Sequence, residues 1–119
     1  MKKYKSNLVN ESFDYTVSAV NHFKPLYKNI NFRPFIYQLK RSVSSISSNI
    51  EEAQFSKSEK EFAWYYKIAL KSGSETKHWL RLLSATMPEH TENINKFMPK
   101  VQELTKILAA SIISLRKDK

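Results

Sequence analysis

QLKRSVSSISSNIEEAQ, residues 38–54, combines a regular apolar pattern with many short polar side chains. Apolar residues recur through this region at alternating intervals of three and four, at Ile36, Leu39, Val43, Ile46, Ile50 and Ala53. This period predicts an α-helix with one buried face. Serine and asparagine normally favour caps and turns, because their side chains compete for backbone hydrogen bonds. The five serines and the asparagine of this stretch therefore need a structural or functional explanation.

The polar side chains of this helix divide between two faces. One line flanks the apolar face at about 100° and consists of Gln38, Arg41, Ser42, Ser45, Asn49 and Glu52. The side chains predicted to face water are Lys40, Ser44, Ser47 and Glu51. Three interpretations of the flanking line are open: a buried hydrogen-bond network that sets helix register, a small-residue interface in a homo-oligomer, or a catalytic or ligand-binding site.

The composition indicates one globular domain spanning residues 1–119. With 41% apolar residues and no low-complexity tract, a chain of 119 residues can bury a sizeable core. The absence of cysteine excludes disulfides, thiolate metal sites and a cysteine nucleophile, and it fits a reducing, cytoplasmic location. No continuous apolar run follows the basic start MKKYKSNLV, so neither a signal peptide nor a membrane span is expected.

Four helical segments account for nearly the whole chain and predict an all-α, antiparallel up-down-up-down four-helix bundle. The first runs from about residue 6 to residue 28, and its predicted apolar face is Val9, Phe13, Thr16, Val20, Phe23 and Tyr27. Pro25 is able to kink or end this helix. The second begins near Pro34, a suitable first-turn residue, and ends at about residues 54–56.

The third segment begins at SEKE, residues 58–61, whose S-x-x-E spacing is that of a capping box. Its apolar face is Phe62, Tyr66, Ala69, Gly73, Thr76, Leu80, Leu83 and Met87. The fourth segment follows TMPEHTEN, residues 86–93, and its face is Ile94, Phe97, Val101, Leu104, Leu108 and Leu115. Pro99 marks either the true start of this helix or a kink within it.

Small residues occupy the middle of the third segment. Gly73, the single glycine, costs about 1 kcal/mol relative to alanine in a helix interior, so its position predicts the close approach of a neighbouring helix. Ser72, Glu75 and Trp79 form a line beside it at helical spacing. We expect this line to meet the flanking line of the second helix, which gives a structural polar network of Gln38, Arg41, Ser45, Asn49, Glu52, Ser72, Glu75 and Trp79.

The titratable residues show no arrangement typical of an enzyme. A serine nucleophile needs a nearby base, and His22, His78 and His90 have no spacing that would supply one. These histidines also lack H-x-x-x-H geometry, and the nearest Glu-x-x-His pair, Glu75 with His78, has no second copy to complete a di-iron site. We therefore expect no catalytic residue, no metal and no cofactor.

The net charge of +9 is concentrated at the two ends of the chain. Residues 1–41 contribute +6, residues 42–92 contribute −1 and residues 93–119 contribute +4. Such a surplus favours anionic partners such as RNA, although it also serves to solubilise a surface. The candidate nucleic-acid-binding residues are Lys2, Lys3, Lys5, Lys40, Arg41, Arg116, Lys117 and Lys119.

FAWYY, residues 62–66, is a dense aromatic cluster with lysines nearby. Aromatic side chains beside basic residues can stack on the bases of single-stranded RNA. Helical spacing instead favours a place in the core for Phe62, Tyr65 and Tyr66. Trp64 is expected to face outward, so it is the residue of this cluster to test at an interface.

The two central helices resemble the signature of the 23S rRNA intervening-sequence protein family, a set of small bacterial four-helix-bundle proteins. The family pattern Q-L-x-R-[SA]-x-x-S-I-x-x-N-I-x-E-G is matched by Gln38, Leu39, Arg41, Ser42, Ser45, Ile46, Asn49, Ile50 and Glu52, with Ala53 in place of the final glycine. The pattern S-x-x-E-F, followed by I-A-L-x-S-x-x-E-T-x-x-W-L-x-L-L, is matched by Ser58, Glu61, Phe62, Ile68, Ala69, Leu70, Ser72, Glu75, Thr76, Trp79, Leu80, Leu82 and Leu83. The likeness covers residues 6–117 in layout and is most specific over residues 38–83.

The resemblance implies a function mainly through the fold. The family is similar in fold to the accessory variability determinant proteins of diversity-generating retroelements, which form basic pentameric barrels that bind nucleic acid and a reverse transcriptase. By that resemblance we expect a non-enzymatic, basic homopentamer that binds RNA or a nucleoprotein partner. The alternative is a structural scaffold or adaptor that binds another protein, such as a reverse transcriptase, without contacting nucleic acid.

Overall fold

A computed structural model describes residues 2–117 of the protein, together with the side chains of residues 7–116, and most of these residues are helical. The elements in chain order are α1 (Lys2–Phe23), η1 (a 3-10 helix, Pro25–Lys28), α2 (Arg33–Ala53), α3 (Glu59–Thr86), η2 (a 3-10 helix, Pro88–His90), α4 (Thr91–Asn95) and α5 (Met98–Lys117). No strand occurs within residues 2–117, so the prediction of an all-α fold is confirmed. None of the helices in this range is long and apolar enough to cross a lipid bilayer.

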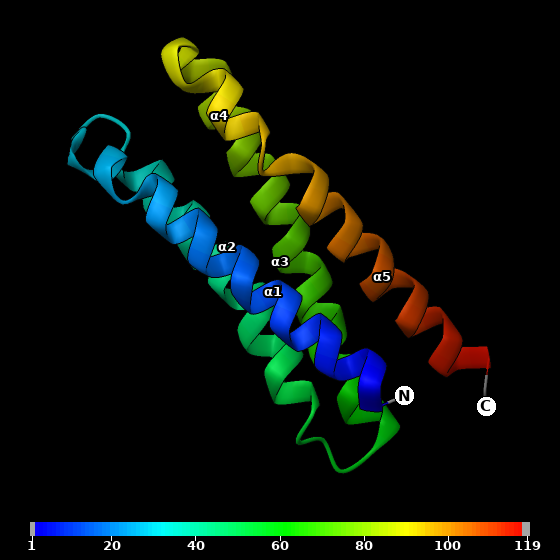
Figure 1. The fold of residues 1–119 in the computed structure, drawn as a ribbon. Coiled ribbons are helices and arrows are strands. Elements are labelled where there is room, and N and C mark those ends of the chain that lie inside the picture. Colours follow the sequence, from blue (N-terminus) through cyan, green and yellow to red (C-terminus); the bar gives the residue numbers. More distant parts are fainter. Residues whose placement is uncertain (1, 118–119) are drawn as a thin grey trace.

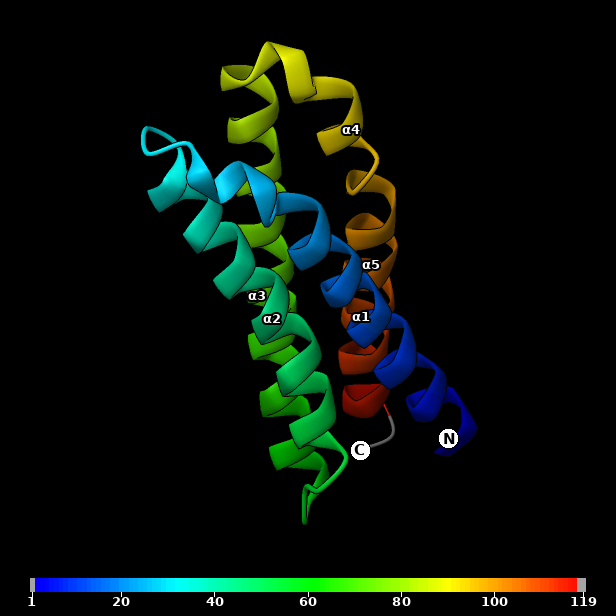
Figure 2. The same ribbon diagram turned by 60° about the vertical axis from the view of Figure 1, so that its left-hand side comes forward.

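The long helices run side by side, and the chain reverses direction at each connector between α1, α2 and α3 (Figure 1). Helices α4 and α5 then return together along α3. Helix α2 packs against both α1 and α3, and α5 packs against α3. The first turn of α1 and the last turn of α5 lie at the same end of the elongated molecule, which measures 48 × 21 × 21 Å (Figures 1 and 2).

Local sequence signals determine where the helices end. Pro25 follows the end of α1, since a proline inside a helix removes a hydrogen bond and clashes with the preceding turn. Pro34 lies in the first turn of α2, where no intrahelical partner for its missing N–H is lost. At the start of α3, the Ser58 hydroxyl accepts a hydrogen bond of 3.1 Å from the Glu61 backbone N–H, as the capping-box spacing predicts. Pro99 lies in the first turn of α5, so it marks the start of a helix.

The predicted apolar faces of α2 and α3 form the centre of the core. The six predicted core residues of α2 are each at most 1% exposed, and all eight residues predicted for the third segment, including Met87 just past the end of α3, are buried. Val101, Leu104 and Leu108 of α5 are completely buried as well. The predicted fourth helix is divided, because α4 ends at Asn95 and α5 begins at Met98.

The face of α1 that packs into the core differs from the predicted one. Its buried residues are Leu8, Ser12, Tyr15, Ala19 and Phe23. Phe13, which the apolar period assigned to the core, is 51% exposed. The cause is that two hydroxyl-bearing residues are buried with hydrogen bonds of their own, which a pattern of apolar residues does not register. The Ser12 hydroxyl donates to the Val9 carbonyl oxygen at 3.1 Å, and the Tyr15 hydroxyl donates to the Phe97 carbonyl oxygen at 2.6 Å.

Ser47 also lies elsewhere than predicted. The sequence predicts that it faces water, but it is 6% exposed and its Oγ lies 3.0 Å from Thr16 Oγ1. The reason is that α1 covers this side of α2, so α2 is packed on more than its apolar face. Ser44 and Ser48, in contrast, are exposed.

Gly73 of α3 lies directly against Thr105 of α5. A Cβ atom at this position would overlap the Cγ2 methyl group of Thr105 on α5. The Thr105 side chain is held by its hydroxyl, which donates to the Gln102 carbonyl oxygen at 2.9 Å. The absence of a side chain at Gly73 therefore allows the close approach that the sequence predicts.

Replacing Gly73 with alanine should lower the free energy of unfolding by about 1 kcal/mol. Overpacking costs about 1–3 kcal/mol, which exceeds the gain of about 1 kcal/mol in helix propensity. In a Thr105→Ser background the clashing methyl group is gone, so Gly73→Ala should then be neutral or stabilising. Urea denaturation of the four proteins measures both effects. Greater stability of Gly73→Ala with Thr105 intact would contradict this account of the helix contact.

Candidate functional site

Hydroxyl groups pair directly across the contact between α2 and α3. The Ser72 hydroxyl donates to Ser45 Oγ at 2.7 Å. One turn along α3, Thr76 Oγ1 lies 2.9 Å from Ser42 Oγ. Asn49 adds to the first pair by donating from Nδ2 to the Ser45 carbonyl oxygen at 2.8 Å. Buried polar groups are tolerated when they are hydrogen-bonded, so these short side chains let the two helices approach closely.

The remaining residues of the predicted polar network lie at its edges. The Arg41 Nε donates to Gln38 Oε1 at 3.3 Å, a contact within α2 itself. Glu52 is exposed, and Glu75 is half-buried. Trp79 is also half-buried, and its ring centroid lies 6.2 Å from that of Phe35 on α2. The structure thus brings Ser45, Asn49 and Ser72 together and places the larger polar side chains around them.

Two of the cross-helix partners lay outside the predicted polar network. Thr76 was assigned to the apolar face and Ser42 to the flanking line, yet both are buried and face each other. The spacing contained this signal, since Thr76 follows Ser72 by four residues and Ser45 follows Ser42 by three. Two pairs of hydroxyls at matching intervals on neighbouring helices meet one helical turn apart.

The predicted nucleic-acid-binding residues occupy two separate regions. The side chains of Lys2, Lys3, Lys5 and Lys117, and the whole of Lys119, lie outside the described part of the structure. The first turn of α1 and the last turn of α5, where Arg116 is exposed, share one end of the molecule (Figure 2). Lys40 and Arg41 belong to the half of α2 nearer the opposite end. The structure therefore does not unite them with the first group.

Two of the three cations on α2, Arg33 and Lys40, face the ring of Tyr27. The Lys40 ammonium lies 4.1 Å from the centroid of the Tyr27 ring, a cation–π arrangement. Arg33 also faces Tyr27, with its guanidinium carbon 5.2 Å from the ring centroid. These contacts place both side chains beside η1, which contains Tyr27.

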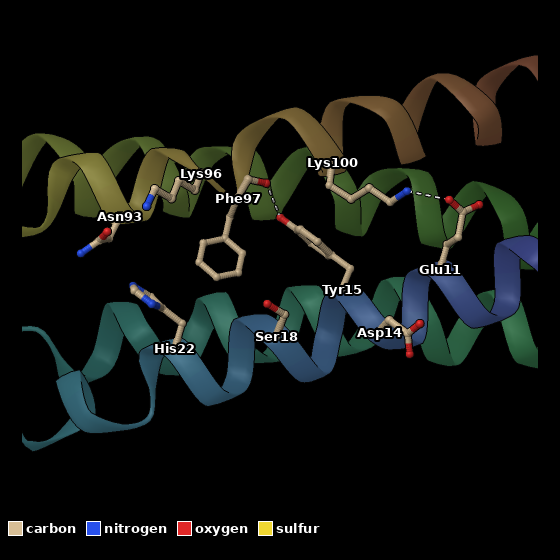
Figure 3. A pocket seen from close by; sticks show the side chains of 9 residues that line it. All are labelled: Glu11, Asp14, Tyr15, Ser18, His22, Asn93, Lys96, Phe97 and Lys100. Atoms are coloured by element: carbon tan, nitrogen blue, oxygen red, sulfur yellow. Dashed lines mark hydrogen bonds and ion pairs between the residues drawn. The ribbon is translucent and has the colours of Figure 1, made fainter.

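A groove of about 620 Å³ separates α1 from α4 and α5 (Figure 3). The residues lining it are Glu11, Asp14, Tyr15, Ser18, His22, Asn93, Lys96, Phe97 and Lys100. Tyr15 crosses the groove, donating to the Phe97 backbone and packing edge-on against its ring with centroids 6.1 Å apart. Burial raises the pKa of Tyr15, which keeps the hydroxyl protonated as a hydrogen-bond donor.

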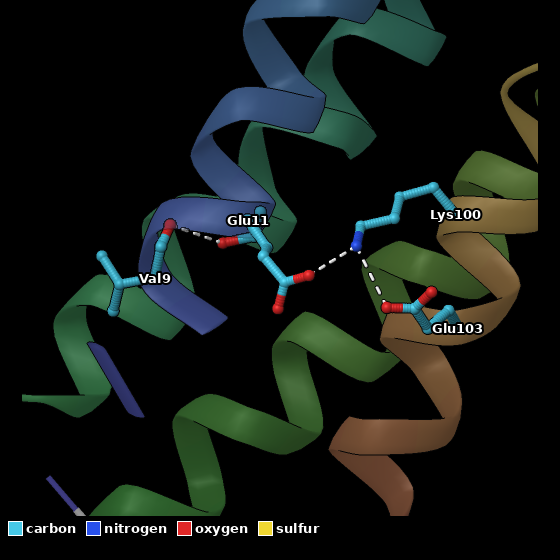
Figure 4. A network of polar contacts seen from close by, with 5 residues as sticks. Val9, Glu11, Lys100 and Glu103 are labelled. Atoms are coloured by element: carbon cyan, nitrogen blue, oxygen red, sulfur yellow. Dashed lines mark hydrogen bonds and ion pairs between the residues drawn. The ribbon is translucent and has the colours of Figure 1, made fainter. Parts of the chain in front are cut away.

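At the other end of this groove, an ion pair between Lys100 of α5 and Glu11 connects α5 to α1 (Figure 4). Its ammonium lies 2.7 Å from a carboxylate oxygen of Glu11 on α1 and 3.0 Å from one of Glu103 on α5. The hydrogen bond to Glu11 is the main cause that raises the pKa of Lys100, and the bond to Glu103 acts in the same direction against partial burial. Among the described side chains, Lys100 is the one lysine or arginine in an ion pair with a carboxylate.

His22 lies against aromatic rings at the end of the groove nearer α4. Its ring centroid is 4.9 Å from that of Phe23 and 5.1 Å from that of Phe97. Burial, followed by the nearby His90 and Lys96, lowers the pKa of His22 below its ordinary value. The neutral imidazole is therefore the form that the folded protein favours.

The fold and these contacts define a small, all-helical protein with a positive net charge and hydroxyl-paired central helices. The chain belongs to the 23S rRNA-intervening sequence protein family, whose family model matches residues 5–110. This confirms the family that the two central sequence patterns indicate.

A solved structure supports the same relationship. The crystal structure of a protein of unknown function from the S23 ribosomal protein family of Bacteroides thetaiotaomicron VPI-5482 is 30% identical and superposes with a TM-score of 0.83. The match covers 91% of this chain and 96% of the other. A search of curated proteins finds no significant match.

The lowered pKa of His22 predicts a pH-dependent loss of stability. Below the ordinary value of 6.5 the unfolded chain binds a proton that the folded protein resists, so the free energy of unfolding falls as the pH decreases from about 7 to about 5.5. His22→Gln should make this decline shallower, because the group that resists protonation in the folded protein is then absent. Urea denaturation across this pH range measures the slope. A decline equally steep in His22→Gln and wild type would contradict the assignment.

Proposed function

We propose that this protein is a non-enzymatic, RNA-binding four-helix bundle of up-down-up-down topology, in which α4 and α5 together form the fourth arm. The family name links its members to 23S rRNA genes, which agrees with an RNA ligand. The observation that carries the proposal is the uncompensated positive charge. The net charge is +9, and within the described residues carboxylates neutralise the ammonium of Lys100 alone in ion pairs.

Uncompensated cations on exposed helices are suited to a polyanion. Each phosphate that a lysine or arginine neutralises releases condensed counterions, which makes binding favourable and strongly dependent on salt. Arg41 and Arg116 are both exposed and belong to the two separate regions of candidate residues. An extended RNA could contact both regions along a molecule whose longest dimension is 48 Å.

RNA binding should be strong at low salt and should weaken steeply as salt is added. Arg41→Ala and Arg116→Ala should each lower the affinity and reduce the slope of log affinity against log salt by about one. Lys100→Gln is the matched control, because it removes one charge whose ammonium already pairs with Glu11 and Glu103. Filter binding with a structured RNA measures the affinity. Absence of binding by the wild type at low salt would overturn the proposal.

We further propose that several copies assemble, and that the assembly is a homopentamer. Two exposed apolar side chains, Phe13 at 51% and Val17 at 42%, stand one turn apart on α1. Adjacent apolar side chains on a surface are typical of protein contacts. Assembly would also multiply the positive charge of one protomer.

Light scattering should give a mass five times the 14.0 kDa of the chain. Phe13→Glu should reduce this mass while preserving the helical signal in circular dichroism, since Phe13 lies outside the core. A wild-type monomer at micromolar concentration would rule out the pentamer.

A scaffold or adaptor for another protein, such as a reverse transcriptase, is the second candidate. The exposed Phe13 and Val17 favour it, because the same apolar pair could bind a different chain. The two candidates differ in the RNA titration. A scaffold that makes no nucleic-acid contact shows no salt-dependent RNA binding.

A further inference from the structure

We propose that the outer face of α3 around Trp64 binds single-stranded RNA, with the indole stacking on a base and flanking lysines contacting phosphates. This inference rests on the proposed function, which supplies RNA as the ligand. It adds where the RNA binds and that the bound RNA is single-stranded. The residues concerned are Lys60, Trp64, Lys67 and Lys71. They lie in the part of the chain whose summed charge is close to neutral.

The spacing of these residues places them on one face of one helix. They follow each other at intervals of four, three and four residues within α3, and all are exposed. With a rise of about 1.5 Å per residue, Lys60 and Lys71 stand about 16 Å apart along the axis. Cationic side chains therefore lie on both sides of Trp64 along the helix, as a strand running past the indole would require.

Trp64 is suited to stacking because it is held by buried neighbours and exposed itself. Its side chain is 55% exposed, whereas Phe62 and Tyr66 beside it are buried in the core. The Tyr65 ring packs edge-on against the indole, with centroids 5.1 Å apart at an interplanar angle of 73°. A depression of about 340 Å³ beside Trp64 is also lined by Ser58, Lys60, Glu61 and Lys67.

The preference for single-stranded over duplex RNA follows from the chemistry of stacking. In a duplex the bases already stack on each other and their faces are covered, so an indole on a helix surface gains little from them. Unpaired bases can be splayed onto an aromatic side chain, and such stacking contributes about 1–3 kcal/mol per base. An exposed indole flanked by lysines therefore favours a single strand.

Two carboxylates, Glu59 and Glu61, lie near this face and oppose the lysines. Both occupy the first turn of α3, where the positive end of the helix dipole offsets part of their charge. Lys57, also exposed, adds a further cation just before the helix. Glu75, which is half-buried, adds a third carboxylate one turn beyond Lys71, so four lysines face three carboxylates along this side of the helix.

The test measures fluorescence anisotropy of a labelled oligouridylate of about ten nucleotides, with an RNA duplex of equal length and an oligothymidylate in parallel. Trp64→Ala should weaken binding to the single-stranded RNA at least about fivefold, and Trp64→Phe should recover most of this loss. Lys67→Ala combined with Lys71→Ala should reduce the salt slope by about two. Circular dichroism and thermal melting check that each variant is folded.

The outcomes separate this inference from the proposed function. If the wild type binds RNA and Trp64→Ala binds equally well, the α3 site is wrong and the proposed function stands. Tighter binding to the duplex or to the oligothymidylate than to the oligouridylate would likewise overturn the assignment of single-stranded RNA. If the wild type binds a structured RNA but not the oligouridylate at low salt, the α3 site is wrong and the proposed function stands. If it binds neither, the proposed function fails, and this inference fails with it.

Discussion

The close packing around one turn of α3 is the constraint on which the rest of the fold depends. Ser72 meets Ser45 of α2 through a hydroxyl pair, and the adjacent Gly73 makes room for Thr105 of α5. Successive residues of a helix point about 100° apart. The same turn of α3 therefore contacts α2 at Ser72 and α5 at Gly73. The relative placement of α2 and α5 therefore follows from the small size of two consecutive side chains.

The side of the molecule between α1 and α5 is joined in a different way. There the contacts come from long side chains, with Tyr15 reaching the Phe97 backbone and Lys100 reaching Glu11. Exposed ion pairs contribute little, about 0–1 kcal/mol, whereas the buried aromatic contacts of Tyr15 contribute through burial of apolar surface. This side consequently encloses a groove, while the α2–α3 contact is closed by short hydroxyl pairs.

The sequence predicted the buried residues best for helices that are buried along one continuous face. The apolar faces of α2 and α3 and the Ser58 cap follow from spacing alone, because helices buried along one face show the period directly. The face of α1 was missed because Tyr15 is buried with a hydrogen bond to a residue far away in sequence. The lysines near Trp64 were not among the predicted nucleic-acid-binding residues, because a charge summed along residues 42–92 conceals how charges divide among helix faces.

The shared position of the first turn of α1 and the last turn of α5 has a consequence for chain connectivity (Figure 2). Since these two turns lie at the same end of the molecule, a short peptide could join them and a new opening could be placed in the connector between α2 and α3. Circular permutation is tolerated where termini are close and the new break lies in an exposed connection. We therefore expect a chain that carries the same helices in a permuted order to reach the same arrangement.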